Sequence, residues 1–311
     1  MSSEEKKLLG YVPHGMTPSK IRSITDKCEA ECTAREVMQH CTSSWGYKNI
    51  ANPKTLDKSV EAPSKPNGYS DGSLKNPVGN HWAIGGIGIW WPNRKNEEEP
   101  LNEQEAKYSE HEWCQQGCMQ WAAFNELKNS STRCETGGAR MAIQRDGPVH
   151  VGIDNQATVI GPNSIADHHK RRMEAQLTNE SGGLIIGGKI TPLHRKSASK
   201  SPWPLIQNGD LWQNIEEVVI AKGPKSVKVS KVKGHATGEM VEEGLVKAED
   251  KAGNDISDKA AEKGAEQTNI VAAALGYVYA KRHKFYKGFM RRIQKFIIKI
   301  RKVEDEKRKR K

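Results

Sequence analysis

A single histidine and a pair of aspartates form the first group of residues with chemical potential. His235 stands in the segment KGHAT, and Asp255 and Asp258 follow it at a spacing of three. Residues three apart lie on one face of a helix, so the two carboxylates share a face. An imidazole exchanges protons near neutral pH and therefore suits proton transfer. This stretch predicts a histidine on a flexible loop ahead of a helix that carries carboxylates.

Three further acids end or open predicted elements. Asp71 comes directly before a turn in GYSDGS, Glu135 falls in the first turn of a helix, and Asp154 ends an apolar strand. Buried carboxylates repel one another and take up protons unless a cation lies among them. Mg²⁺ prefers oxygen ligands, and a pair of such ions stabilises both oxygens in phosphodiester cleavage. The chain has 38 acidic residues, so residue types alone do not single out Asp71, Glu135, Asp154 and Asp258.

The elements that must position these acids alternate between the two periods of secondary structure. Apolar runs and alternation predict strands at 83–91, 119–127, 149–154 and 226–232. Helical spacing predicts helices at 133–143, 157–169, 208–224 and 255–267, with Gly161-Pro162 breaking or kinking the second of them. This order predicts a mixed α/β layer, in which ligand sites form beyond the carboxyl ends of the strands.

Four short motifs carry a resemblance to a known family. YSDGS at 69–73, SSTRCE at 130–135, GIDNQ at 152–156, and KGHAT followed by GNDISDKAA come in that order. Over residues 69–267 the sequence resembles ribonuclease H of type 1, including the versions carried by retroelements. The resemblance implies a ribonuclease H-like α/β fold, a mixed five-stranded sheet with helices on both faces. An extra N-terminal segment and a basic C-terminal helix lie outside it.

The same resemblance implies an activity and assigns the site. The expected reaction is hydrolysis of the RNA strand of an RNA·DNA hybrid, with two Mg²⁺ ions as cofactors and Mn²⁺ as a substitute. The implied metal ligands are Asp71, Glu135, Asp154 and Asp258, with Asp255 as a neighbour of the last. His235 matches the mobile loop histidine that assists proton transfer and product release. The implied contacts to the hybrid's sugars and phosphates are Ser131, Thr132, Arg133 and Asn155. A catalytically silent nucleic-acid-binding protein derived from a retroelement is the alternative.

The sequence departs from the family pattern in two places. SKPNG precedes Asp71, and proline pairs poorly inside a central strand. We therefore expect a short first strand and a looser metal site. Residues 170–204 are rich in Gly, Lys and Ser without a sustained period, although HHKRR at 168–172 and HRK at 194–196 supply positive charge.

Charge is concentrated at the C-terminus. The chain carries a net charge of +11, and residues 281–311 hold fifteen Lys or Arg against three acids. The other 280 residues therefore have a net charge close to −1. Phe285, Phe289, Ile293, Ile297 and Ile300 recur at near-helical spacing within this basic segment. Three roles fit: a helix docked on the core, a nucleic-acid arm, or an interfacial membrane helix.

Composition sets the remaining expectations. We expect a polar, partly disordered segment at 1–66, a ribonuclease H-like domain at 67–268 and a basic helix or tail at 269–311. No apolar run reaches the length of a membrane span, and no signal region opens the chain, so we expect a nuclear or cytoplasmic protein with reduced thiols. Zinc could use Cys28, Cys32, His40 and Cys41, or Cys114 and Cys118, but these spacings match no common zinc motif. The sequence names no protein partner.

Overall fold

The computed structural model of the 311-residue chain describes residues 34–36, 49–77, 79, 82–125, 129–178, 183–186, 189–192, 197–268 and 270–309. Two compact units are present. The larger comprises residues 43–75 and 85–268, and the smaller comprises 1–42, 76–84 and 269–311. The division at residues 66 and 268 stays a prediction. The suggested zinc ligands Cys28, Cys32, His40 and Cys41 lie outside the described residues.

One mixed sheet forms the framework of the larger unit. Its order is β3-β4-β2-β1-β5-β8, six strands rather than the expected five. The pairs β2/β4 and β3/β4 are antiparallel, and β1/β5 and β5/β8 are parallel. The strands are β1 (Gly68–Lys75), β2 (Ile84–Pro92), β3 (Glu110–Cys114), β4 (Gly117–Ala123), β5 (Val149–Ile153) and β8 (Val227–Lys231). A separate two-stranded sheet pairs β6 (Gly183–Ile186) with β7 (Lys189–Pro192).

The extra strand is β3, which forms a hairpin with β4 at the edge of the sheet. Its five residues, EHEWC, are almost all exposed. A strand without a buried face has no apolar alternation, which is why the sequence pattern did not predict it.

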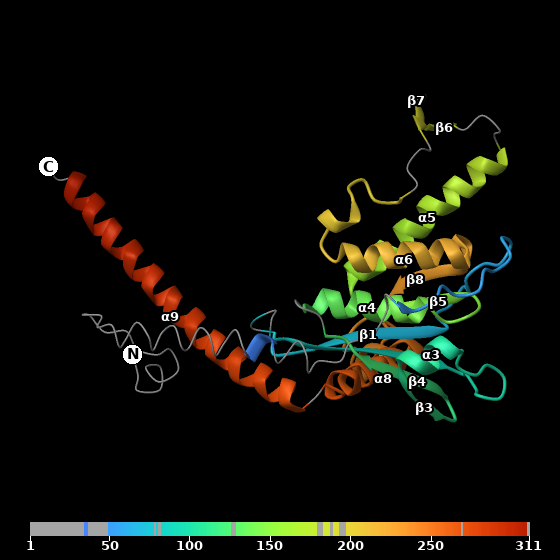
Figure 1. Cartoon of the computed structure of the whole chain (residues 1–311), viewed down its shortest axis with the longest axis horizontal. Coiled ribbons are helices and arrows are strands. Elements are labelled where there is room, and N and C mark those ends of the chain that lie inside the picture. Colours follow the sequence, from blue (N-terminus) through green and yellow to red (C-terminus); the bar gives the residue numbers. More distant parts are fainter. Residues whose placement is uncertain are drawn as a thin grey trace. The chain divides into compact units, whose positions relative to one another are not determined.

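Helices cover both faces of the sheet, as Figure 1 shows for α4 and α8. Alternate residues of β2 face opposite ways. A Cβ on Gly88 would lie 2.2 Å from the backbone nitrogen of Ala261 in α8, whereas Ile87 contacts the side of α4 near Gly137. The helices are α3 (Glu103–Tyr108), α4 (Ser131–Ile143), α5 (Gln156–Thr178), α6 (Gly209–Lys222), α7 (Gly238–Glu242), α8 (Ala248–Glu266) and α9 (Ile270–Lys309). Short 3₁₀ turns span Trp203–Leu205 and Pro224–Ser226.

We expected a break or a kink at Gly161-Pro162, and the break is wrong, because helix α5 runs through Pro162 without ending there. Proline removes one backbone hydrogen bond, and tertiary contacts can compensate for that loss. Asn163 supplies such a contact to β8. Its side-chain amide donates to the Val229 carbonyl at 2.7 Å and accepts from the Val229 amide at 3.0 Å.

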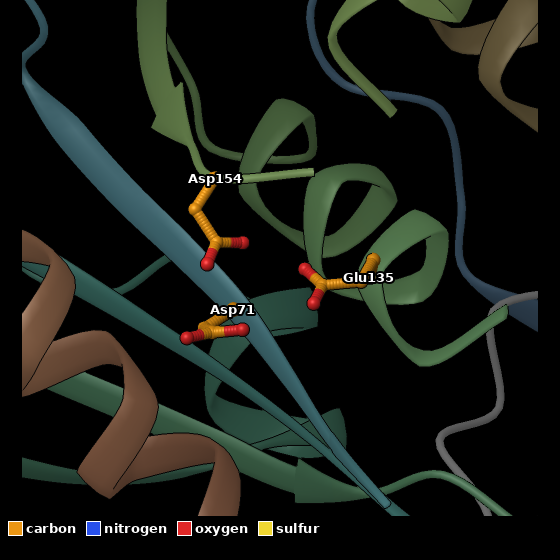
Figure 2. Close-up of side chains that lie close together, drawn as sticks. All are labelled: Asp71, Glu135 and Asp154. Atoms are coloured by element: carbon orange, nitrogen blue, oxygen red, sulfur yellow. The ribbon is translucent and has the colours of Figure 1, made fainter. Parts of the chain in front are cut away.

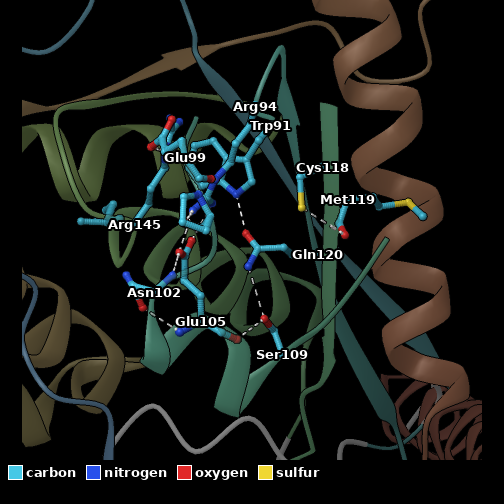
Figure 3. Close-up of polar contacts among 12 residues, drawn as sticks. Trp91, Arg94, Glu99, Asn102, Glu105, Ser109, Cys118, Met119, Gln120 and Arg145 are labelled. Carbon is cyan, nitrogen blue, oxygen red and sulfur yellow. Dashed lines mark hydrogen bonds and ion pairs between the residues drawn. The ribbon is translucent and has the colours of Figure 1, made fainter. Parts of the chain in front are cut away.

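A buried polar cluster holds the chain between β2 and β3 against the core (Figure 3). The guanidinium of Arg94 pairs with both carboxylate oxygens of Glu105 at 2.8 Å, and both side chains are buried. Arg145 lies over the ring of Trp91 and pairs with Glu99. The indole of Trp91 donates to Gln120.

In the smaller unit, the first turns of α9 pack on residues 82–84. The ring of Tyr279 stacks on Trp82 with centroids 4.6 Å apart. Ala272 and Ala280 join Trp82 and Ile84 in one apolar cluster. Among the described residues, no helix has the length and apolar character needed to cross a bilayer.

Candidate metal centre

Three carboxylates from three elements converge near the end of β5. Asp71 is the fourth residue of β1, Glu135 lies on α4, and Asp154 directly follows β5. The parallel register pairs Gly68 with Val151, which places Asp71 level with Asp154 on the adjacent strand. One oxygen from each of the three carboxylates lies within 4.8 Å of the others. Figure 2 shows the side chains pointing toward one another.

Two local expectations differ from the structure. Asp71 lies inside β1, which continues to Lys75, rather than before a turn. The prolines at 63 and 66 come before the strand begins at Gly68, so they remove no pairing from the part of β1 that carries Asp71. Helix α4 begins at Ser131, capped by the side chain of Ser130, so Glu135 follows the first turn.

Close approach of α4 to β1 brings Glu135 beside Asp71. A Cβ on Gly72 would lie 2.3 Å from the backbone nitrogen of Glu135. On α4, a Cβ on Gly138 would lie 2.8 Å from the Asp71 carbonyl oxygen. The absence of both side chains lets the helix backbone approach the strand backbone. These two glycines position the site, and the sequence analysis did not assign them that role.

The buried negative charges disfavour their own ionisation. Burial, and then the charge of Asp154, raises the pKa of Asp71 above its ordinary value. Burial, and then the charge of Asp71, raises the pKa of Glu135. The Oε2 atom of Glu135 is buried and has no hydrogen-bond partner. Three oxygen donors with an unpartnered buried oxygen fit a hard divalent cation such as Mg²⁺ or Mn²⁺.

The fourth predicted ligand lies close by but outside this cluster. Asp258, on α8, contributes its negative charge to the raised pKa values of Asp71 and Glu135. Its neighbour Asp255 instead pairs with Lys251 at 2.5 Å, one turn away on the same helix. Asp258 therefore remains the better candidate of the two, and its role as a ligand stays a prediction.

The loop that carries His235 begins beside Asp154. Val232 donates its amide to the Ile153 carbonyl at 3.0 Å, which fixes the start of the loop next to β5. A Cβ on Gly234 would lie 2.1 Å from Oδ2 of Asp154, so a larger residue there would displace this carboxylate. His235 follows with an exposed side chain and a left-handed backbone, φ 49°. The structure thus places an exposed imidazole one residue after Gly234, the glycine that lies against Asp154.

The predicted substrate contacts divide into two groups. Ser131 is exposed and Thr132 is half-buried at the start of α4. The guanidinium of Arg133 is instead held by both oxygens of Asp210, at 2.9 and 2.6 Å. The side-chain oxygen of Asn155 accepts from the Thr158 amide at 3.1 Å at the start of α5. Asp210 was missed because nothing in the sequence links residues so far apart.

Cys114 and Cys118 form no metal site with other ligands in the described part of the chain. They lie on the β3–β4 hairpin rather than on a helix, and Cys118 pairs with Trp113. Burial raises the pKa of the Cys118 thiol to about 12, which opposes the thiolate form that zinc requires.

Comparisons with known proteins return structural neighbours only. No family model and no curated protein matches the chain. The foamy viral protease-reverse transcriptase in complex with RNA/DNA hybrid is similar over 70% of this chain, at 13% identity and a TM-score of 0.35. This chain spans 22% of that protein's length. A type 1 RNase H with the type 2 active-site motif, LC9-RNase H1, is similar over 67% of this chain and 76% of its own, at 15% identity and a TM-score of 0.35. The PFV RNase H domain is similar over 64% of this chain and 93% of its own, at 17% identity and a TM-score of 0.32.

The assignment of the fold rests on the order of the sheet and on the elements that carry the four motifs. YSDGS lies on β1, SSTRCE opens α4, GIDNQ ends β5, and the KGHAT loop follows β8. The chain has a mixed sheet with helices on both faces, and the motifs lie on it at the places that the resemblance to ribonuclease H implies. The predicted fold class is confirmed, with six strands in place of five.

Proposed function

We propose that the chain is a divalent-metal-dependent endonuclease that hydrolyses the RNA strand of an RNA·DNA hybrid. The observation that carries the proposal is the cluster of buried Asp71 and Glu135 with half-buried Asp154, in which one oxygen of each lies within 4.8 Å of the others. Without a cation, the carboxylates of such a cluster repel one another and take up protons. The motifs that supply the three acids resemble those of type 1 ribonuclease H.

The protein's own residues have distinct tasks in this proposal. Asp71, Glu135 and Asp154 hold the cations, and Asp258 completes the ligand set as the hybrid binds. Bound divalent ions would activate water and stabilise the charge that develops on the phosphodiester. His235, which is exposed, moves protons at the scissile phosphate and withdraws from it as the product is released. Ser131 and Thr132 contact the backbone of the hybrid at the start of α4.

Arg133 has a different task from the one that the sequence implied. Its bidentate contact with the exposed Asp210 joins α4 to α6 and keeps the start of α4 in place. It therefore positions Ser131 and Thr132 rather than reaching a phosphate itself.

Cleavage of a labelled hybrid tests the proposal. We expect the full chain to cut the RNA strand in the presence of Mg²⁺ and not in the presence of a chelator. Asp154→Asn should lower the rate by at least about 10²-fold because it removes a ligand. Asp258→Asn should also lose activity, whereas Asp255→Asn, one turn away and paired with Lys251, should retain it.

The alternative is a silent nucleic-acid-binding protein. The ion pair between Arg133 and Asp210 favours this alternative, since a residue that was predicted to contact the substrate is already paired within the protein. Salt-sensitive binding of the hybrid without cleavage, identical in the wild type and in Asp154→Asn, would establish this alternative and refute the nuclease.

A further inference from the structure

The second half of α9 has a continuous apolar face. At about 100° per residue, its apolar side chains between 285 and 303, apart from Ile298, fall within an arc of roughly 140°. Five of these side chains are exposed, among them Phe296 at 64%, Ile297 at 57% and Ile300 at 52%, and the other four are half-buried. The members of this apolar face are Phe285, Tyr286, Phe289, Met290, Ile293, Phe296, Ile297, Ile300 and Val303.

The rest of the same segment is basic. Residues 281–303 contain ten Lys or Arg and no acid. Arg292 and Lys299 lie along one border of the apolar face and Arg301 along the other, by the same helical spacing. Long basic side chains at such borders can keep their charges at a polar surface while their stems cover apolar groups.

This face is not a continuation of the surface by which α9 packs in its own unit. The buried residues of α9 are Ala272, Gly276 and Ala280, all in its first turns. By helical spacing, these three lie roughly 110° around the axis from the centre of the apolar face. The packing of the first turns therefore does not cover the apolar face, which is exposed from Phe296 to Val303 and half-buried at most of its earlier positions.

We propose that residues 285–303 form an interfacial helix that binds the surface of an anionic bilayer. The apolar face enters the boundary between headgroups and acyl chains, and the Lys and Arg side chains contact anionic headgroups. A helix with one strongly basic face and one face of aromatic and aliphatic residues has the character that such surfaces bind. The segment lies along the membrane plane for about 28 Å, at 1.5 Å per residue.

A nucleic acid and a second copy of the helix would each complement only part of this surface. A nucleic acid would neutralise the basic residues but leave the apolar face in water, because its phosphates contact only charge. A second copy of the helix would cover the apolar face but bring two basic segments together. Residues 285–303 contain no acid at the borders of the face to pair across such a dimer.

The chain offers a closely matched pair of variants. Ile297 lies on the apolar face at 57% exposure, and Ile298 lies on the opposite, basic face at 55% exposure. Both substitutions to glutamine remove the same side chain without changing charge. Co-sedimentation of the full chain with vesicles of phosphatidylcholine and phosphatidylserine, in a chelator, measures the partition coefficient. We expect Ile297→Gln to lower it about five- to tenfold and Ile298→Gln to change it less than twofold.

Vesicle composition and salt test the basic face. Vesicles of phosphatidylcholine alone should bind more weakly, and added salt should weaken binding to the anionic mixture. Equal partition of Ile297→Gln and Ile298→Gln would overturn the proposal. It would also be overturned if the wild type ignored anionic vesicles and instead either bound a nucleic-acid duplex or formed a dimer lost in Ile297→Gln. Circular dichroism confirms that both variants keep their helix content.

Discussion

Asp71, Glu135 and Asp154 lie together, and burial, followed by the neighbouring negative charges, raises the pKa of Asp71 and of Glu135. Such a cluster is stabilised either by protons or by a cation. The site therefore links three quantities that can be measured together: pH, metal binding and the free energy of unfolding.

Without metal, the stability of the larger unit should fall as the pH rises. A carboxyl group whose folded pKa is raised contributes stability that is fully present below its unfolded pKa and lost as pH rises through the folded value. For Asp71 the decline begins near 3.8, the ordinary value, and continues toward neutrality. Mg²⁺ should then raise the melting temperature more at pH 8 than at pH 5, because protons compete with the metal. Thermal unfolding with and without Mg²⁺ measures this difference.

Glu135→Gln is the control for that experiment. The substitution removes one of the repelling charges, so the metal-free protein should depend less on pH and respond less to Mg²⁺. An equal Mg²⁺ shift at both pH values in the wild type would argue against a shared carboxylate site.

The sequence predicted some of these residues better than others. The motif resemblance identified the acids, but residue types and periodicity did not. Gly72 was not assigned a role, because its effect depends on a close approach between α4 and β1. The resemblance assigned Arg133 to the substrate, and its contact with Asp210 could not be predicted because the two residues are distant in the sequence.

At the scale of elements, glycines decide how closely helices approach the sheet. Gly88→Ala would place a Cβ 2.2 Å from the Ala261 nitrogen and 2.5 Å from the Ser257 carbonyl oxygen. Relieving this overlap requires α8 to move, so we expect a loss of about 1–3 kcal/mol in the free energy of unfolding. Urea denaturation measures it. Gly238→Ala is the control, because a Cβ there meets nothing within 4 Å. A neutral Gly88→Ala would mean that α8 does not pack on β2 as described.

A second prediction at this scale concerns Arg94 and Glu105, the buried ion pair in the chain between β2 and β3. Arg94→Met leaves the buried carboxylate of Glu105 without its guanidinium and should cost about 3–5 kcal/mol. The double variant Arg94→Met/Glu105→Gln should recover part of this loss, because no unpaired charge remains. Glutamine also retains an oxygen for the amide of Asn102, which Glu105 bonds at 2.9 Å. Additive losses in a double-mutant cycle would show that the two side chains do not interact.

Elements with a buried, periodic face were predictable. The apolar residues of α6 and β8 recur at the period of a helix and of a strand, and β2 and β5 are short, largely apolar runs. The exposed strand β3 has no such pattern, and α3 is only six residues long. At Pro162 the local preference of proline predicted a break or kink of the helix. The helix continues there because residues of α5 bond to β8.

At the scale of the whole molecule, metal binding should stabilise one unit and leave the other unchanged. The metal centre lies in the larger unit, whereas α9 belongs to the smaller one. A ligand stabilises the cooperative unit that binds it. Hydrogen exchange should therefore slow in α4 and β5 on addition of Mg²⁺ and stay unchanged in α9. Equal slowing in α9 would indicate that the two units open together.

Titration calorimetry of the full chain with Mn²⁺ or Mg²⁺ tests the central claim most directly. The claim is that Asp71, Glu135 and Asp154 together hold a divalent cation. We expect saturable binding that weakens at least about tenfold in Asp154→Asn. Asp167→Asn should bind as the wild type does, because Asp167 is an exposed acid on α5. Absence of saturable binding in the wild type, or equal binding in Asp154→Asn, would contradict the account.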